Sequence, residues 1–498
     1  MRTGKEYLDA LRDGRTVIVD GGRVGDVTTH PAFRGIAETT AALYDLAADP
    51  ANEMTYVAPE TGRQALLPFM LPRSRDDLRA RREAIWRWAE VSQGFVGRSP
   101  DHVAGFLAGF AAHPEVFDRE RRLGANVTAW YRRLLDESLF FSYVIIPPQV
   151  SRADTAHAWE GSFIQVGVSE ERDDGIVLRG SQMLATGAAV ADHLLISCIK
   201  PLTPDDADFA VTAVIPMAAP GLKVYCRRPY APDQPSTYDY PMSTRFDETD
   251  ALVVFEDVFV PWSDVFVCRD VQALQQQFFG TGAHLLGNTQ AQIRFAVKLR
   301  FLAGLARKIC QVNQIDRIPS VVEKLGELAS LVATVEGMVL AAEAAAAPDE
   351  NGVWLPHPRF LYAPMAAQAE TYPRVLHIVR ELAGGGVLQL PSSYRELQTP
   401  EMADDLARYV QSPGVPAAER VKLFKLAWDV VGSEFAGRHH QYEMFYAGAP
   451  FAAKGYAYRN YGYDEAVGVV DRFLDGYGLP GPDEGGRRKE EESAQARA

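Results

Sequence analysis

An arginine and a histidine four residues apart, Arg98 and His102, stand where the sequence predicts the start of a helix. In the run GRSPDH, Ser99 can be the N-cap, Pro100 the first helical residue and Asp101 part of the first turn. The backbone N–H groups and the dipole of a helix favour an anion at this end. The same field, together with Arg98, lowers the pKa of His102 and leaves it neutral, able to accept a proton. The site would stabilise a phenolate; the alternative is a surface arginine beside a capping histidine.

A second stretch able to hold a ligand runs from Phe141 to Arg152, FSYVIIPPQVSR. Pro147 and Pro148 fix the backbone and push their neighbours into extended conformations. A rigid, extended passage at a domain junction can aim its backbone groups at a flat ligand in advance. The alternative is an ordinary interdomain linker.

The elements around these residues change in type along the chain. Helices are expected around 33–46, 75–92 and after Ser99, β-rich runs fill 162–267, and helices return from about 271, including 326–347 and one long stretch at 416–446. The sequence thus predicts an α+β protein with an all-β middle. The expected division is an N-terminal mainly helical domain at 1–145, a middle antiparallel β-barrel or sandwich at 146–270, a C-terminal helical bundle at 271–478 and a flexible tail at 479–498.

Composition excludes several classes of function. The chain has 498 residues, 47% hydrophobic and 23% charged, which is typical of a globular protein. A net charge of −14 argues against nucleic acid as a partner, because phosphate binding needs a basic face. No apolar run is expected to reach the roughly 20 residues of a membrane helix, and no signal peptide is evident. Four dispersed cysteines indicate a reducing, cytoplasmic location.

Common motifs of catalysis and cofactor binding are missing from the sequence. The glycines at 384–386 follow a predicted helix, so they indicate a helix C-cap and not a dinucleotide-binding loop. There is no P-loop, no G-x-S-x-G elbow and no H-E-x-x-H. His439 and His440 would point about a hundred degrees apart on a helix, so they cannot share one metal and are expected to be solvated or at an interface. No metal site is predicted.

Several runs together resemble one family. The order of helices, strands and helices is that of the acyl-CoA dehydrogenase-like flavoproteins. Within that group the chain resembles the oxygenase components of the 4-hydroxyphenylacetate 3-monooxygenase type, the two-component phenol hydroxylases, over nearly its whole length to about Leu474. The runs that carry the resemblance are GKEYLDALRDGR, VGDVTTHPAFRG, LYDLAADP, GRSPDH, NVTAWYRRLLDESLF, PPQVSR, FEDVFVPWSDVF, ERVKLFKLAWD and GSEFAGRHHQYEMFYAG.

The resemblance implies a homotetramer that takes reduced FAD from a separate NAD(P)H-flavin reductase. Oxygen adds to the flavin C4a, and the resulting hydroperoxide delivers an oxygen atom to the ring carbon ortho to a phenolic hydroxyl. Such chemistry requires a dry pocket and a group that draws the proton from the phenol. The apolar segment at 144–148 suits the first requirement, and Arg98 with its neighbours suits the second.

The resemblance also assigns residues. Arg98 matches the family arginine near the phenolic oxygen, whereas His102 stands where the hydroxyphenylacetate enzymes carry tyrosine and Tyr143 where they carry histidine. His284 lies near a histidine of chlorophenol-type relatives, so the base is His102, Tyr143 or His284. The positions that match flavin-contacting residues are Gln149, Val150, Ser151, Arg152, Thr186, Tyr442, Glu443, Tyr446 and Gly448.

The substrate tail is expected to differ from the family pattern. Ile199 and Lys200 stand where the hydroxyphenylacetate enzymes hold the carboxylate with a Ser-Thr pair. A substituted phenol, or a tyrosine-derived aryl group carried on a carrier protein in natural-product assembly, is therefore expected in place of the free acid. A catabolic hydroxylase of 4-hydroxyphenylacetate or chlorophenol is the alternative within the family.

Three further alternatives lie outside phenol hydroxylation. A 4-hydroxybutyryl-CoA dehydratase needs an iron–sulfur cluster, and no cysteine precedes Cys198 to complete its ligands. An acyl-CoA dehydrogenase would need a catalytic glutamate and tightly bound FAD. A scaffold protein would keep the fold without binding flavin.

Overall fold

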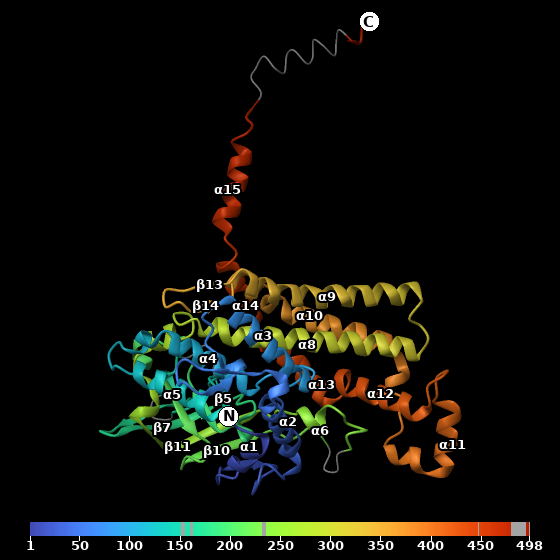
Figure 1. The fold of residues 1–498 in the computed structure, drawn as a ribbon, viewed down its shortest axis with the longest axis horizontal. Coiled ribbons are helices and arrows are strands. Elements are labelled where there is room, and N and C mark those ends of the chain that lie inside the picture. The colour runs from blue at the N-terminus through green and yellow to red at the C-terminus, as the bar shows by residue number, and fades with distance from the viewer. Residues whose placement is uncertain (151–154, 160–162, 232–235, 447, 480–494, 498) are drawn as a thin grey trace.

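The computed structural model describes residues 1–498 apart from 151–154, 160–162, 232–235, 447, 480–494 and 498. Helices of the first and last thirds pack together above the sheets of the middle, and α15 projects away from the body (Figure 1). The N-terminal elements are α1 (Gly4–Ala10), β1 (Val17–Val19), β2 (Gly22–Arg23), α2 (Pro31–Ala48), β3 (Thr55–Val57), β4 (Gln64–Leu66), α3 (Arg75–Val91), α4 (Pro100–Ala112), α5 (Gly124–Glu137) and β5 (Phe141–Val144).

Two sheets form the middle of the molecule, in the orders β2-β1-β10-β11-β7-β6 and β12-β9-β8-β5. Most neighbours are antiparallel, but β1 pairs with β10 and β5 with β8 in parallel, so the sheets are mixed and not purely antiparallel as predicted. Both exceptions are strands from the first 145 residues, so the sheets extend past the expected domain boundary. The remaining middle elements are β6 (Gly167–Glu171), β7 (Gly175–Gln182), β8 (His193–Ile196), β9 (Val211–Pro216), β10 (Leu222–Cys226), α6 (Ser243–Phe246), β11 (Ala251–Pro261) and β12 (Val265–Cys268).

The C-terminal part is a helical bundle. The predicted long helix at 416–446 is two helices, because the chain breaks at Gly432 and restarts with Ser433 as the N-cap of α13. Gly384, with φ 56°, ends α10 as the C-cap, as predicted. The elements are α7 (Val271–Gln276), α8 (Ala283–Val312), α9 (Pro319–Ala344), β13 (Ala347–Pro348), β14 (Trp354–Leu355), α10 (Pro358–Ala383), α11 (Pro400–Tyr409), α12 (Ala417–Val431), α13 (Glu434–Phe445), α14 (Pro450–Arg459) and α15 (Tyr463–Leu474).

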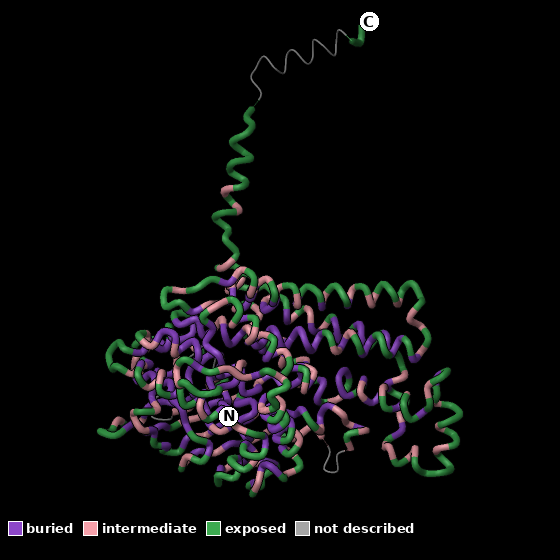
Figure 2. The backbone as a smooth tube through the Cα atoms, viewed as in Figure 1, coloured by how far each residue is buried: buried purple, intermediate pink, exposed green. Residues whose placement is uncertain are grey.

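Helix α9 corrects the expectation that no stretch is apolar enough to cross a membrane. An 18-residue window in it has a mean hydropathy of 1.5, so by length and composition it could do so, although only 28% of that window is buried. Its inner face packs on α8 and α10, and its outer face is exposed (Figure 2). The alanine-rich sequence thus forms the outermost layer of the bundle.

The helix predicted after Ser99 is present and starts at Pro100 as expected. Ser99 occupies the N-cap position, but its hydroxyl donates to the Asp101 carboxylate and accepts no backbone N–H of the first turn. Helix α4 lies directly against the start of α8, where a Cβ added to Gly109 would come within 2.3 Å of the Ala283 Cα. This close approach brings the first turn of α4 beside α8 and so positions the site described below.

We expect Gly109→Ala to destabilise the fold by about 1–3 kcal/mol, because the new methyl group would meet backbone that cannot move aside. Gly304→Ala, at an exposed site within α8 where an added Cβ meets nothing within 4 Å, is the matched control. It should be neutral or stabilise by up to about 1 kcal/mol. Urea unfolding of both variants checks this, and equal stability of the two would contradict the close approach.

Candidate active site

The structure brings Arg98, His102 and Tyr143 together. The Arg98 guanidinium is hydrogen-bonded to Nε2 of His102, one turn further along the chain. The guanidinium carbon lies 6.0 Å from the centroid of the Tyr143 ring, and the His102 ring lies edge-on to the same tyrosine at 5.9 Å. The trio therefore joins the start of α4 to strand β5, and its members are neighbours, as the resemblance implies.

His102 is buried and held at its other nitrogen. Its Nδ1 lies 3.3 Å from Oε1 of Gln290 and 3.2 Å from the hydroxyl of Tyr446. Burial first, and the charge of Arg98 second, hold its pKa well below the ordinary value. The direction agrees with the prediction, but burial and not the neighbouring charge is the largest cause. The imidazole is neutral at physiological pH.

Tyr143 stands in an aromatic surrounding. Its ring stacks on Phe106 with centroids 4.8 Å apart and lies edge-on to Phe278 at 6.1 Å. Burial raises its pKa far above the ordinary value, against the opposing charge of Arg98. Its hydroxyl therefore stays protonated at neutral pH, as a donor.

One buried carboxylate, Glu248, fixes the backbone in front of α4. One of its oxygens accepts from the backbone N–H groups of Gly97 at 2.8 Å and Arg98 at 2.6 Å. The other oxygen accepts from Arg438 of α13 at 3.0 Å. Arg438 also binds Asp250 at 2.7 Å. Three distant parts of the chain thus meet at this carboxylate.

The predicted flavin contacts Thr186 and Tyr442 lie beside this cluster. The Thr186 hydroxyl donates to Asp250 at 2.7 Å, and its carbonyl accepts from Ser142, the neighbour of Tyr143, at 2.9 Å. The hydroxyl of Tyr442 is buried and has no hydrogen-bond partner among the described residues. The Tyr442 hydroxyl can donate to a flavin carbonyl or ring nitrogen, whereas the Thr186 hydroxyl, which already donates to Asp250, can accept from a ring N–H. The donor set at this place therefore fits the predicted cofactor.

Glu443 is buried in an ion-pair cluster within the bundle. It accepts from Arg294 at 2.9 Å, from Lys298 at 2.7 Å and from Gln368 at 2.7 Å. Burial alone would raise its pKa, but the two cations lower it to about 2. Arg294 also lies 4.7 Å from the centroid of the Tyr446 ring, so the cluster supports the site from behind. A direct contact of Glu443 with flavin stays a prediction.

The expectation that His439 is solvated or at an interface is wrong. Its ring is buried, lies 3.0 Å from the Lys298 ammonium and meets the Phe95 ring edge-on. Burial, followed by the charge of Lys298, lowers its pKa well below the ordinary value. Among the residues that the structure describes, no group of three His, Cys, Asp or Glu side chains could hold a metal ion.

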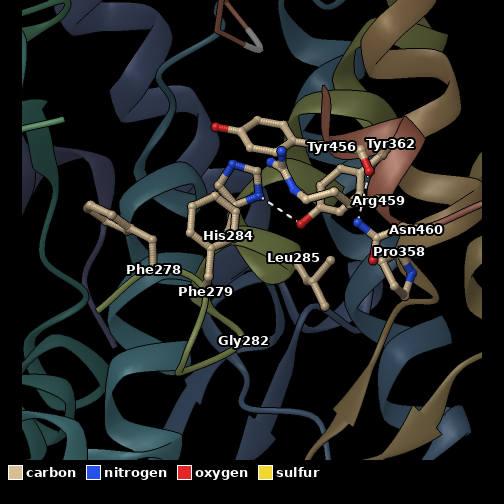
Figure 3. Close-up of a pocket in the computed structure, with 10 residues that line it drawn as sticks. All are labelled: Phe278, Phe279, Gly282, His284, Leu285, Pro358, Tyr362, Tyr456, Arg459 and Asn460. Carbon is tan, nitrogen blue, oxygen red and sulfur yellow. Dashed lines mark hydrogen bonds between the residues drawn. The ribbon is translucent and has the colours of Figure 1, made fainter. Parts of the chain in front are cut away.

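His284 lines a pocket of about 370 Å³, whose lining side chains are drawn in Figure 3. Its Nδ1 lies 3.0 Å from the Tyr362 hydroxyl, and burial lowers its pKa to about 4. Phe278 connects the two places, because it lines the pocket and packs on Tyr143. The described lining residues include no carboxylate, and they are Phe278, Phe279, Gly282, His284, Leu285, Pro358, Tyr362, Tyr456, Arg459 and Asn460.

The remaining predicted residues are less enclosed. Gln149, Val150 and Gly448 are exposed, whereas Ser151 and Arg152 lie outside the described residues. Ile199 is 51% exposed, and its N–H donates to the Ile145 carbonyl at 3.2 Å, past the end of the β5–β8 pair. Lys200 follows it and is half-buried. Both therefore lie past the end of the strand that pairs with the strand of Tyr143.

Sequence reasoning missed Gln290, Glu248 and Arg438. Each acts through partners 150 to 191 residues away in the chain, so no local spacing marks them. The one available signal was composition, since Gln290 and Arg294 are polar residues on a helix whose neighbours are mostly apolar. A buried polar side chain on such a helix needs a partner.

Comparison with known proteins decides the family. The model described as "4-hydroxyphenylacetate 3-hydroxylase N terminal" matches residues 3–267, and the C-terminal model of the same family matches residues 274–475. The chain belongs to the 4-hydroxyphenylacetate 3-hydroxylase family. The predicted fold is likewise confirmed: the solved oxygenase component of 4-hydroxyphenylacetate 3-monooxygenase, complexed with FAD, superposes with a TM-score of 0.90 at 32% identity over 95% of this chain and 98% of that one.

The names of two relatives give substrates of different kinds, one free and one bound to a carrier protein. The 4-hydroxyphenylacetate 3-monooxygenase oxygenase component of Pseudomonas aeruginosa is 35% identical over 90% of this chain and 86% of its own. The Streptomyces globisporus monooxygenase of a 3-amino-3-(3-chloro-4-hydroxyphenyl)propanoyl group on a peptidyl carrier protein is 37% identical over 90% of this chain and 85% of its own. A 4-hydroxybutyryl-CoA dehydratase from N. maritimus shares the fold, with a TM-score of 0.86 at 19% identity, over 96% of each chain.

We expect Glu443→Gln to lower the free energy of unfolding by about 3–5 kcal/mol, because it leaves Arg294 and Lys298 as buried cations without a carboxylate. The matched control is Glu370→Gln, which removes an exposed pair with Lys454 and should leave unfolding unchanged. Chemical denaturation followed by circular dichroism measures both. A similar response of the two variants would show that the buried cluster does not support the fold.

Proposed function

We propose that this chain is the oxygenase component of a two-component, reduced-FAD-dependent phenol hydroxylase, acting ortho to the hydroxyl. The observation that carries the proposal is the meeting of Arg98, His102 and Tyr143 beside aromatic walls in a chain of this family. When bound, the reduced flavin supplies the activation of O2. A separate NAD(P)H-flavin reductase supplies the reduced flavin, in keeping with the name "oxygenase component" that relatives carry.

The residues of the chain bind and activate the phenol. A phenolic oxygen placed between Arg98 and His102 accepts a hydrogen bond from the guanidinium. It also faces Nε2 of His102, the nitrogen to which the guanidinium is hydrogen-bonded in this structure. Tyr143 donates a further hydrogen bond, and a phenol becomes more reactive toward an electrophilic oxygen as it loses its proton. Phe106 and Phe278 exclude water from the ring. The flavin fits beside Thr186 and Tyr442, next to the same strand.

The substrate that we propose is a substituted phenol or a tyrosine-derived aryl group, free or on a carrier protein. The exposed Ile199 in place of a carboxylate-binding pair supports this, as does the carrier-bound substrate named for the Streptomyces relative. The pocket lined by His284 offers room for the part of the substrate beyond the phenol. The shared fold of the dehydratase carries no activity to this chain, because its identity is only 19%.

Turnover of a panel of phenols tests the function. Purified chain, any flavin reductase, NADH and FAD should convert at least one phenol, free or carrier-bound, to a catechol detected by mass spectrometry. Arg98→Ala should lower that turnover by about 100-fold or more, because the phenolate loses its cation. Arg374→Ala, at an exposed ion pair on α10, is the control and should leave it unchanged.

Two results would refute the proposed function. Absence of catechol from every phenol, with normal reoxidation of the flavin, would exclude hydroxylation. Absence of binding in an anaerobic titration with reduced FAD would indicate a scaffold protein. Unchanged turnover in Arg98→Ala would remove this residue from the site.

We propose that the chain assembles as a homotetramer in the cytoplasm. Helix α15 leaves the body with apolar side chains uncovered, among them Val470 at 54% and Phe473 at 72% exposure, and α9 exposes Val322 and Leu340 on its outer face. Apolar surface of this extent on two elements supports contact with further copies. The four cysteines are unpaired, which supports a reducing compartment.

Light scattering of the purified chain should give the mass of four chains. The double variant Val470→Asp and Phe473→Asp should shift that mass downward, since charge placed on the apolar face of α15 opposes its burial. Val57→Asp, at an exposed valine on β3, should not. A monomeric wild-type chain would contradict the assembly.

A further inference from the structure

Gln290 on α8 has a buried side-chain amide, whose NH2 end must face acceptors and whose carbonyl end must face donors. Its Nε2 lies 3.1 Å from the Asp101 carboxylate and 3.1 Å from the Ser99 hydroxyl. Its Oε1 lies 3.3 Å from Nδ1 of His102 and accepts from the Tyr446 hydroxyl at 3.1 Å. An ionised carboxylate only accepts hydrogen bonds, so the NH2 end must face Asp101 and the carbonyl end must face His102.

The orientation of the amide decides which nitrogen of His102 carries the hydrogen. A carbonyl only accepts, so the Nδ1 that faces it is the donor. The Tyr446 hydroxyl also lies 3.2 Å from Nδ1, but its hydrogen has acceptors in the carbonyls of Gly97 and Gln290, each at 3.1 Å, so its oxygen can accept from Nδ1. The neutral imidazole has one N–H, which leaves Nε2 with the lone pair. Nε2 faces Arg98, which can only donate, so the partners at both ends of the ring require the same tautomer.

We propose that Gln290, held by Asp101 and Ser99, is a positioning residue that fixes the Nδ1–H tautomer of His102 and so makes Nε2 the acceptor of the substrate's phenolic proton. The inference rests on the proposed phenol hydroxylation and decides among the bases that the sequence leaves open. The phenol O–H bond breaks, a bond between Nε2 and the proton forms, and the electron pair stays on the oxygen as a phenolate beside Arg98. The imidazolium keeps its Nδ1–H bond to the Gln290 carbonyl.

The surroundings of the other candidate bases support this assignment. Tyr143 is protonated and faces aromatic rings, so it donates and does not accept the proton. His284 lies on the far side of Phe278, with its Nδ1 beside the Tyr362 hydroxyl and no charged partner described for it. Asp101, buried to 1% exposure, has a pKa raised by burial to about 6, so it is ionised at neutral pH and keeps the amide oriented.

Nitrogen-15 NMR of the histidine-labelled full-length chain tests the tautomer without any need for activity. In the wild type, the His102 signals, identified by their loss in His102→Asn, should show a protonated Nδ1 and an unprotonated Nε2. Gln290→Met keeps the volume and removes the amide, and it should give a mixture of tautomers. Asp101→Asn should do the same, because an amide partner no longer dictates which end of Gln290 faces it.

Kinetics give the second readout. Gln290→Met should lower kcat by at least about tenfold with KM changed far less, because the acceptor is lost in part of the molecules. Gln292→Met is the matched control: it is a buried glutamine on the same helix, bonded to Gln368 at 2.9 Å, and it should change neither the tautomer nor kcat.

An unprotonated Nδ1 in the wild type, or a tautomer that Gln290→Met leaves unchanged, would overturn the proposal. If the tautomer shifts as expected but no phenol is hydroxylated by the wild type, the positioning role of Gln290 stands and the proposed function fails. Thermal unfolding of each variant separates these outcomes from a loss of fold.

Discussion

The site depends on the burial of one carboxylate between three segments that are far apart in the chain. Glu248 holds the backbone N–H groups of Gly97 and Arg98 with one oxygen and Arg438 with the other. A carboxylate in such a place is stable only when all its acceptor positions are used, so the three segments are fixed together or not at all. The loop before α4, the segment between α6 and β11, and helix α13 therefore act as one unit. The geometry of Arg98, which precedes α4, follows from this unit.

A second set of polar contacts, behind the reactive side chains, fixes which atoms of those side chains donate and which accept hydrogen bonds. The amide of Gln290 connects Asp101 to His102, and the guanidinium of Arg294 supports the ring of Tyr446. Neither group is placed to touch a substrate. Both restrict what the residues in front of them can do, since buried polar groups with satisfied partners have one stable arrangement. Few side chains thus face the substrate, and a larger number of buried side chains hold them in place.

The sequence predicted the features that depend on residues close together in the chain. The start of α4 was readable from Ser99 and Pro100, and the resemblance placed Arg98, His102 and Tyr143 in one site, which the structure confirms as neighbours. Partners far apart in the chain were not readable, because nothing near Glu248 or Gln290 indicates what each will meet. The expectation for His439 was wrong for the same reason: the angle between neighbouring helix positions says nothing of Lys298 and Phe95, the distant residues that cover this histidine. Residues 151 and 152 lie outside the described part of the chain.

The close contact of α4 with α8 at Gly109 has a consequence for how the enzyme can change. Neither helix has room for a larger side chain there, so natural or laboratory variation in the range of accepted molecules cannot come from this side. The wall of the pocket described above includes the side chains of Leu285, Tyr362 and Tyr456. Selection for new specificities would therefore act on that wall, while the contact between α4 and α8 stays unchanged among the variants.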